Sequence, residues 1–169
     1  MLRGRNNKIV GQTGEYLVAA ELSRRGLICT TFTGNVPHYD IIASNEAGRH
    51  VSVQVKASTS GSWHFSNVTD FCEISFKDKR QIVGKRKDCP VENLVVVFVN
   101  VTNDRNDQYY VLNWNELRDL LIKNHIDCLK KHGGVRPKNP DSLHVGLKEL
   151  HLSPYSEKWE VIESKLASL

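Results

Sequence analysis

One run of residues constrains the fold of this chain more strongly than any other. Residues 94–99 read Leu-Val-Val-Val-Phe-Val, so apolar side chains occupy both alternating sets of positions. Successive side chains of a strand point to opposite faces, so a strand of this composition needs a cover on each face. The run therefore predicts a central strand in a sheet with layers packed on both sides.

The rest of the chain predicts an α/β arrangement around that strand. Periodicity, turn residues and caps predict helices over residues 8–25, 75–87, 114–131 and 156–167, and strands over residues 27–33, 39–44, 49–57, 94–101 and 108–112. Residues 63–65 are a candidate extension of the sheet, and residues 143–152 fit either a helix or a strand. The order helix, three-strand meander, helix, strand, strand predicts a mixed sheet in one domain over residues 1–131. Residues 132–169 form a C-terminal helical extension, which packs on the same domain or on a partner.

The charged residues indicate a polyanionic partner through their distribution. The net charge is only +4, but six cations fall within eleven residues, with Asp78 as the only acid among them. Clustered cations gain free energy on a polyanion by releasing its counterions, so this cluster is a candidate nucleic-acid surface; a solvated face is the alternative. The six residues are Lys77, Lys79, Arg80, Lys85, Arg86 and Lys87.

The remaining composition predicts a cytoplasmic protein without a membrane anchor or a small-molecule cofactor. No apolar segment follows the basic N-terminal residues, and no apolar run is long enough to span a bilayer. The four cysteines are scattered and form no Cys-x-x-Cys pair, so we expect neither a structural zinc nor disulfides.

Glu15 is a carboxylate on an apolar helical stripe. Val18 and Leu22 follow it at i+3 and i+7, which predicts that its side chain faces the core. An unpaired buried charge is costly, so Glu15 needs a partner there. The alternative is a glutamate near the helix start that reaches water.

Three further polar residues lie on the predicted strands. Asp40 interrupts the apolar strand at residues 39–44, where aspartate is disfavoured. Gln54 and Lys56 alternate with valines in the third strand and therefore share one face. Ordinary explanations exist, because backbone donors can satisfy a strand-edge aspartate and half-exposed strands carry polar residues on the outer face.

Taken together, these four residues predict a divalent-metal site. A hairpin at residues 45–48 places the Asp40 strand beside the Lys56 strand. We expect the helix that carries Glu15 to pack across the face that holds Asp40, Gln54 and Lys56, so that two carboxylates and an amide oxygen converge. Such oxygen ligands suit Mg²⁺ or Mn²⁺, which can activate water and neutralise charge during phosphodiester hydrolysis. The Lys56 ammonium can stabilise the charge that develops.

The same residues resemble a known superfamily of nucleases. Gly14-Glu15 on a first helix, then Tyr39-Asp40-Ile41-Ile42 and Gln54-Val55-Lys56, resemble the ordered motif of the PD-(D/E)XK superfamily over about residues 8–112. The similarity is greatest to the Holliday-junction-resolvase-like and modification-dependent restriction branches. It implies a restriction-endonuclease-like core and a magnesium-dependent endonuclease acting on DNA, and the frequency of dimers in such nucleases implies a homodimer. The family's Pro-Asp pair is displaced here to Pro37-His38-Tyr39-Asp40.

The resemblance also implies a role for each site residue. Asp40 becomes the principal metal ligand, Glu15 an accessory ligand and Lys56 the catalytic lysine, and the Val55 carbonyl completes the metal shell. Gln54 stands where most members carry an acid; several branches use glutamine there, although an amide binds metal more weakly than a carboxylate. The alternative is a catalytically inactive nuclease-fold module that binds nucleic acid or a protein partner, and the retained charged residues argue against it.

Four residues near these motifs are further candidate contacts to nucleic acid. Ser58 can donate to a phosphate, and Trp63 can stack on a base. His64 can hydrogen-bond to nucleic acid, and His38 can contact a phosphate or the metal. The alternatives are core packing for Trp63 and loop positions without a role for the others.

Overall fold

A five-stranded mixed sheet forms the centre of the computed structural model, which describes residues 6–32 and 36–168. Its strands, in spatial order, are β1 (Ile28–Thr31), β2 (Ile41–Ser44), β3 (His50–Ser58), β7 (Leu94–Asn100) and β8 (Gln108–Asn113). Strands β3 and β7 are parallel, and the other neighbours are antiparallel. The helices are α1 (Asn6–Arg24), α2 (Trp114–Lys131), α3 (Glu149–Leu152) and α4 (Glu160–Ala167).

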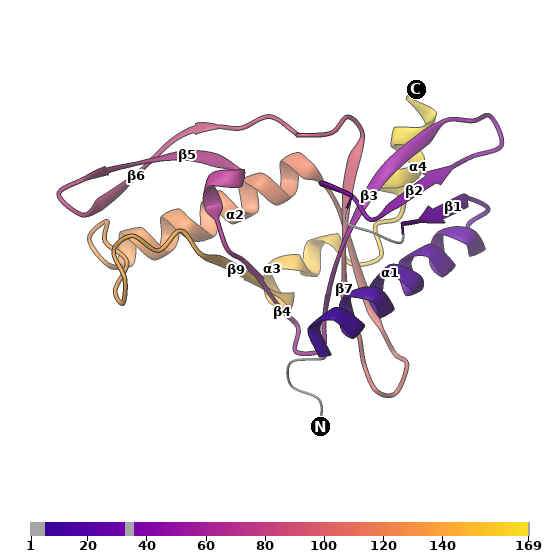
Figure 1. Ribbon diagram of the computed structural model, residues 1–169, viewed down its shortest axis with the longest axis horizontal. Coiled ribbons are helices and arrows are strands. Elements are labelled where there is room, and N and C mark those ends of the chain that lie inside the picture. The colour runs from indigo at the N-terminus through magenta and orange to yellow at the C-terminus, as the bar shows by residue number, and fades with distance from the viewer. Residues whose placement is uncertain (1–5, 33–35, 169) are drawn as a thin grey trace.

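The two faces of the sheet carry separate apolar cores, as the run at residues 94–99 predicts. On the first, which we call the α1 face, Val53 and Val55 of β3 pack with residues of α1 and α4. On the second, the α2 face, Val96 and Phe98 of β7 pack with Trp63 and with α2. Figure 1 shows α1 beside the central sheet and α2 extending away from it on the other side.

The segment between β3 and β7 is not helical, which corrects the predicted helix over residues 75–87. It contains β4 (Ser62–Phe65), the 3-10 turn η1 (Val68–Asp70), β5 (Cys72–Lys77) and β6 (Arg80–Arg86). Strands β5 and β6 form an antiparallel hairpin closed by Asp78 and Lys79, whose φ angles of 48° and 66° suit a two-residue hairpin turn. In β5 apolar and polar residues strictly alternate, a period of two that marks a strand.

Residues 63–65 form a strand outside the central sheet, which corrects their expected place. β4 pairs with β9 (Val145–Lys148) in a separate antiparallel sheet, with Trp63 opposite Leu147. Residues 143–152, for which the sequence fits either a helix or a strand, contain both: the strand β9 and the short helix α3. The β4–β9 pair therefore ties the C-terminal extension to the segment that follows β3.

The last helix of the extension packs on the α1 face. Trp159, Ile162 and Leu166 are almost completely buried and share a core with Val18 and Leu22 of α1. The helix begins at Glu160, four residues later than predicted. The end of the strand predicted over residues 27–33 lies outside the described residues. No helix in the described part of the chain has the length and apolarity needed to cross a membrane.

A buried polar pair anchors the β5–β6 hairpin to α2. Gln81 Nε2 donates to the carbonyls of Pro140 and Ser142 at 2.6 and 3.1 Å. Gln81 Oε1 therefore accepts, and it lies 2.8 Å from His125 Nε2, which identifies that nitrogen as the protonated one. His125 Nδ1 is buried and has no hydrogen-bond partner among the described residues. Burial, and secondarily Arg136, lowers the pKa of His125 from 6.5 to about 4.

The buried neutral His125 makes the stability of the protein depend on pH. The unfolded chain binds a proton at this residue below about pH 6.5 and the folded protein only below about pH 4, so stability falls as the pH drops through that window. We expect His125→Gln to reduce the loss of unfolding free energy between pH 7 and pH 5 by on the order of 2 kcal/mol. Urea unfolding at both pH values measures this loss. The control is His132→Gln, at the exposed end of the same helix, and equal losses in both variants would contradict the prediction.

Candidate active site

Asp40 lies immediately before β2, beside the middle of β3. The next residue, Ile41, pairs with Val53 in the sheet register. The Asp40 N–H donates to the Val53 carbonyl at 2.9 Å, and the Val55 N–H donates to Asp40 Oδ2 at 2.7 Å. The carboxylate is therefore held at the edge of β3, at the point where the pairing with β2 ends.

Glu15 approaches the same edge from helix α1. The helix packs closely on β3, because a Cβ on Gly14 would lie 2.5 Å from Ala57 Cβ and 3.5 Å from Val55 Cγ1. Glu15 follows Gly14 and is half-buried. Its pKa is raised, mainly by burial and secondly by the negative charge of Asp40. Gly14 of α1 and the Asp40 carboxylate therefore both contact the segment of β3 around Val55.

Gln54 and Lys56 project from the α2 face of the sheet. The prediction that helix α1 covers the face with these two residues is therefore wrong. In the parallel pairing with β7, Gln54 lies beside Val96 and Lys56 beside Phe98, and both partners belong to the core under α2. Helix α1 instead covers the valines of β3 on the other face. The cause is apolar burial, because the apolar stripe of α1 needs an apolar surface and the alternating valines supply it. Glu15 and the Gln54/Lys56 pair therefore approach the site from opposite faces.

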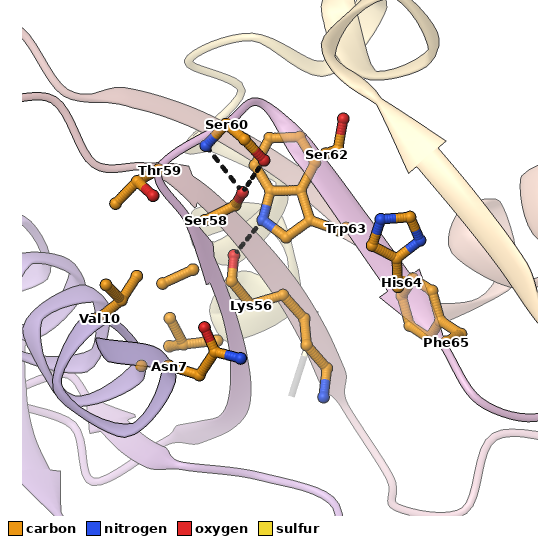
Figure 2. A pocket seen from close by; sticks show the side chains of 13 residues that line it. Asn7, Val10, Lys56, Ser58, Thr59, Ser60, Ser62, Trp63, His64 and Phe65 are labelled. Carbon is orange, nitrogen blue, oxygen red and sulfur yellow. Dashed lines mark hydrogen bonds between the residues drawn. The ribbon is translucent and has the colours of Figure 1, made fainter. Parts of the chain in front are cut away.

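Trp63 holds the segment of β3 that carries Lys56. Its Nε1 donates to the Lys56 carbonyl at 2.8 Å, as Figure 2 shows. The indole is buried and packs edge-on against Phe98 and Tyr110. It has no free face for a base, which corrects the prediction that Trp63 stacks on nucleic acid. Its contribution is to fix the strand from which the lysine projects.

Lys56 lies between two hollows in the surface. The first, of about 590 Å³, is bounded by Asn7 of α1 and by the loop after β3. In Figure 2 the Lys56 side chain extends into this hollow beside Asn7. The second, of about 440 Å³, is bounded by Gln54 and by Lys87 at the base of the hairpin. Lys56 and Phe65 line both hollows, so the lysine is accessible from each side.

The other predicted contacts occupy different surroundings. Ser58 is buried, and its Oγ accepts a hydrogen bond from the Ser60 N–H at 3.1 Å, within its own loop. His64 is exposed and stacks on His144, with 5.1 Å between ring centroids. His38 is exposed and lines the second hollow. The two histidines are therefore placed where a ligand can reach them, whereas the Ser58 hydroxyl is engaged in its turn.

Sequence reasoning did not single out several residues that line the hollows. Asn7 lies in the first turn of α1, and no motif distinguishes it from other polar residues at a helix start. Asp70 and Asp88 border the second hollow with Lys87. Only the packing of α1 on β3, and the path of the chain through β4 and the hairpin, bring these residues near Lys56.

The donor atoms at the edge of β3 fit a hard divalent cation. Within residues 6–32 and 36–168, no three side chains drawn from His, Cys, Asp and Glu gather as a metal site, and the carboxylates near this edge are those of Glu15 and Asp40. Continuing the β2–β3 register by one residue places Asp40 opposite Gln54. The Val55 carbonyl points to the same edge as the Val55 N–H that binds Asp40. Mg²⁺ keeps several waters and takes one or two carboxylates, and two carboxylates are present near this edge.

Neutralising Glu15 is expected to stabilise the metal-free protein. A raised carboxyl pKa means that the fold favours the protonated form of Glu15. This contribution to stability is complete below pH 4.5, the ordinary pKa, and is lost as the pH rises through the raised pKa. Glu15→Gln should therefore raise Tm at pH 7 in EDTA, and the gain should vanish in acid. Thermal unfolding measures the Tm of both proteins, with Glu46→Gln at an exposed turn position as the control. A Tm for Glu15→Gln below that of wild type would contradict the prediction.

The fold of this chain is similar to that of a solved endonuclease. No protein-family model and no curated protein sequence matches the chain. The bacterial homing endonuclease I-Ssp6803I superposes with a TM-score of 0.54 over 96% of this chain and 97% of that chain, at 14% identity. Hjc, a Holliday junction resolvase from Archaeoglobus fulgidus, superposes with a TM-score of 0.48 over 90% and 95%, at 13% identity. The first likeness shows that the chain shares the α/β fold of that endonuclease, with a mixed central sheet, which confirms the predicted fold class apart from the helix that the β5–β6 hairpin replaces.

Proposed function

We propose that the protein is a divalent-metal-dependent endonuclease that hydrolyses phosphodiester bonds in DNA. The observation that carries the proposal is that Gly14, next to Glu15, and the Asp40 carboxylate both contact β3 around Val55, next to Lys56. Two carboxylates that repel each other favour a cation between them. Mg²⁺ or Mn²⁺ suits a site made of carboxylate, amide and carbonyl oxygens.

Each residue of the site has a proposed role. Asp40 is the principal ligand and Glu15 an accessory one, with Gln54 and the Val55 carbonyl as neutral oxygens. The metal, when bound, would activate water and neutralise charge on the phosphate. The Lys56 ammonium orients the attacking water and stabilises the charge that develops on the phosphate oxygens.

Two observations favour DNA as the substrate. The structural likeness is to a homing endonuclease, and the site residues follow the order of the PD-(D/E)XK motif. The exposed cations of the β5–β6 hairpin also provide a surface for a polyanion. The predicted homodimer remains an expectation from the resemblance alone.

A cleavage assay tests the proposal. Supercoiled plasmid, linear duplex, four-way junction and single-stranded DNA, with an RNA of the same sequence, are incubated with the protein and Mg²⁺, Mn²⁺ or EDTA. We expect metal-dependent cleavage of at least one DNA form and its loss in Lys56→Met, with Lys158→Met at an exposed position as the matched control. If the wild-type protein cuts no form with either metal, the enzyme proposal fails. Binding without cleavage would then support the inactive nucleic-acid-binding module instead.

A further inference from the structure

The β5–β6 hairpin presents a cationic ribbon with one free face. In its register Ser75 lies opposite Ile82 and Lys77 opposite Arg80, and residues directly opposite share a face. All four are exposed, and Ile82 keeps 48% of its surface accessible. This outer face therefore combines two cations with a small hydroxyl and an apolar group, and Lys79 sits at the turn beside them.

The opposite face of the hairpin is fixed to the protein body. Gln81 is buried, and it is held by hydrogen bonds to His125, to two carbonyls of the C-terminal extension and, through its N–H, to the Gly134 carbonyl at 2.9 Å. Val83 packs against the core under α2. Because these contacts hold the ribbon close to its turn, the outer face keeps a fixed direction rather than moving as a free arm.

The cations near the turn of the ribbon are not held in ion pairs among the described residues, although Asp78 lies at the turn and Glu73 in β5. Arg86, near its base, forms an ion pair with Asp119 of α2 at 3.4 Å. Within the described part of the chain, Lys77, Lys79 and Arg80 take part in no ion pair. The three cations near the turn are therefore free to bind a polyanion.

The ribbon begins next to the candidate active site. Lys87, which follows β6, lines the hollow that also contains Gln54 and Lys56. Figure 1 shows the hairpin running from there along α2, away from the central sheet. Eight residues of extended chain from the turn to Lys87 span about 26 Å, which is less than one turn of B-DNA at about 34 Å. A duplex bound at Lys56 can therefore be contacted by the ribbon within the same helical turn.

We infer that this ribbon enters the major groove of duplex DNA and contacts bases there, an inference that rests on the proposed function. A two-stranded antiparallel ribbon fits the major groove, which is about 12 Å wide, but not the minor groove, which is about 6 Å wide. Lys77, Lys79 and Arg80 bind the phosphates on the groove walls. Ser75 and Ile82 form the next pair on the same face, two residues farther from the turn, where a hydroxyl can hydrogen-bond a base edge and an apolar side chain can contact a thymine methyl group. The ribbon is thus a specificity element separate from the cleavage site.

The phosphate contacts are tested by the salt dependence of binding. Binding of a 40-base-pair duplex is measured in EDTA at several salt concentrations for wild type, for Lys77→Gln/Arg80→Gln and for the matched control Arg105→Gln/Lys158→Gln. The hairpin variant should lower the slope of log K against log salt by about 1.8 and weaken binding about tenfold at 0.1 M salt, and the control should change binding by less than about twofold. Equal slopes for wild type and the hairpin variant would overturn the inference.

Groove blocking tests the orientation of the ribbon. A duplex whose cytosines carry a bulky C5 substituent has a filled major groove, and netropsin fills the minor groove of A·T tracts. We expect the first to weaken wild-type binding about tenfold and to have little effect on Ser75→Ala/Ile82→Ala, while netropsin changes wild-type binding by less than about twofold. Unchanged binding to the C5-substituted duplex, or competition by netropsin, would overturn the major-groove assignment.

These measurements are independent of catalysis. They are made without a metal, so a protein that cuts no DNA but binds duplex through the hairpin supports the ribbon and refutes the nuclease proposal. If the wild-type protein cuts DNA and the hairpin variants keep its salt slope and groove sensitivity, the nuclease proposal is supported and the ribbon inference is refuted.

Discussion

Asp40→Asn is expected to abolish metal-dependent cleavage, with a loss of about 10³-fold or more in rate at saturating DNA. Asparagine keeps an oxygen in the place of Oδ2, so the hydrogen bond from the Val55 N–H is retained and the fold should persist. What disappears is the negative charge that opposes Glu15 and attracts the cation. The variant therefore separates the electrostatic role of Asp40 from its structural one.

The variant should also change metal binding. Titration with Mn²⁺ by calorimetry should show binding to wild type and a loss of at least tenfold in affinity for Asp40→Asn, because half of the negative charge at the site is gone. Asp127→Asn, the same change at an exposed position of α2, should leave both cleavage and metal affinity unchanged. A fully active Asp40→Asn variant would show that the metal site is elsewhere or absent.

Gly14→Ala is expected to have the largest effect on stability, a loss of about 2 kcal/mol or more. The new methyl group would lie 2.5 Å from Ala57 Cβ, and both atoms belong to rigidly placed backbone elements, so α1 must move away from β3. The intrinsic preference of helices for alanine over glycine, about 1 kcal/mol, is too small to compensate. Displacement of α1 also moves Glu15 away from Asp40, so cleavage should fall with stability.

Two partner variants test the Gly14 prediction. Gly11 lies on the same helix with nothing within 4 Å of its added Cβ, so Gly11→Ala should be neutral or stabilising. Ala57→Gly removes the opposing methyl group, so the double variant Gly14→Ala/Ala57→Gly should regain much of the lost stability. Urea unfolding measures the stability of wild type, Gly14→Ala, Gly11→Ala and Gly14→Ala/Ala57→Gly. Equal effects of Gly14→Ala and Gly11→Ala would show that α1 is not in close contact with β3.

The local sequence predicted most of the elements, because each has its own periodic pattern. The run at residues 94–99 predicted the strand covered on both faces, and α2 begins and ends where its pattern and its Asn113–Glu116 capping box indicate. The hairpin at residues 72–86 was missed although β5 alternates with the period of a strand, because the predicted helix began at Ser75 and cut across that pattern. Its turn carries Asp78 and Lys79 at positive φ, which the sequence marks less clearly than glycine would.

The candidate site divides in the same way between sequence and structure. The sequence by itself determined the chemical groups and the strand alternation: a helix glutamate, an aspartate that lies just before β2 and not inside it as predicted, and Gln54 and Lys56 together on one face. It did not determine which face the helix would cover, because that depends on which surface buries more apolar area once the sheet has formed. The tertiary structure placed α1 on the valines, brought Gly14 and Asp40 to the same segment of β3 where β2 begins, and set the base of the cationic hairpin beside the hollow that Lys56 lines. Local patterns determine the parts, and long-range packing determines their arrangement, because the apolar faces can be buried only against partners that are distant in the sequence.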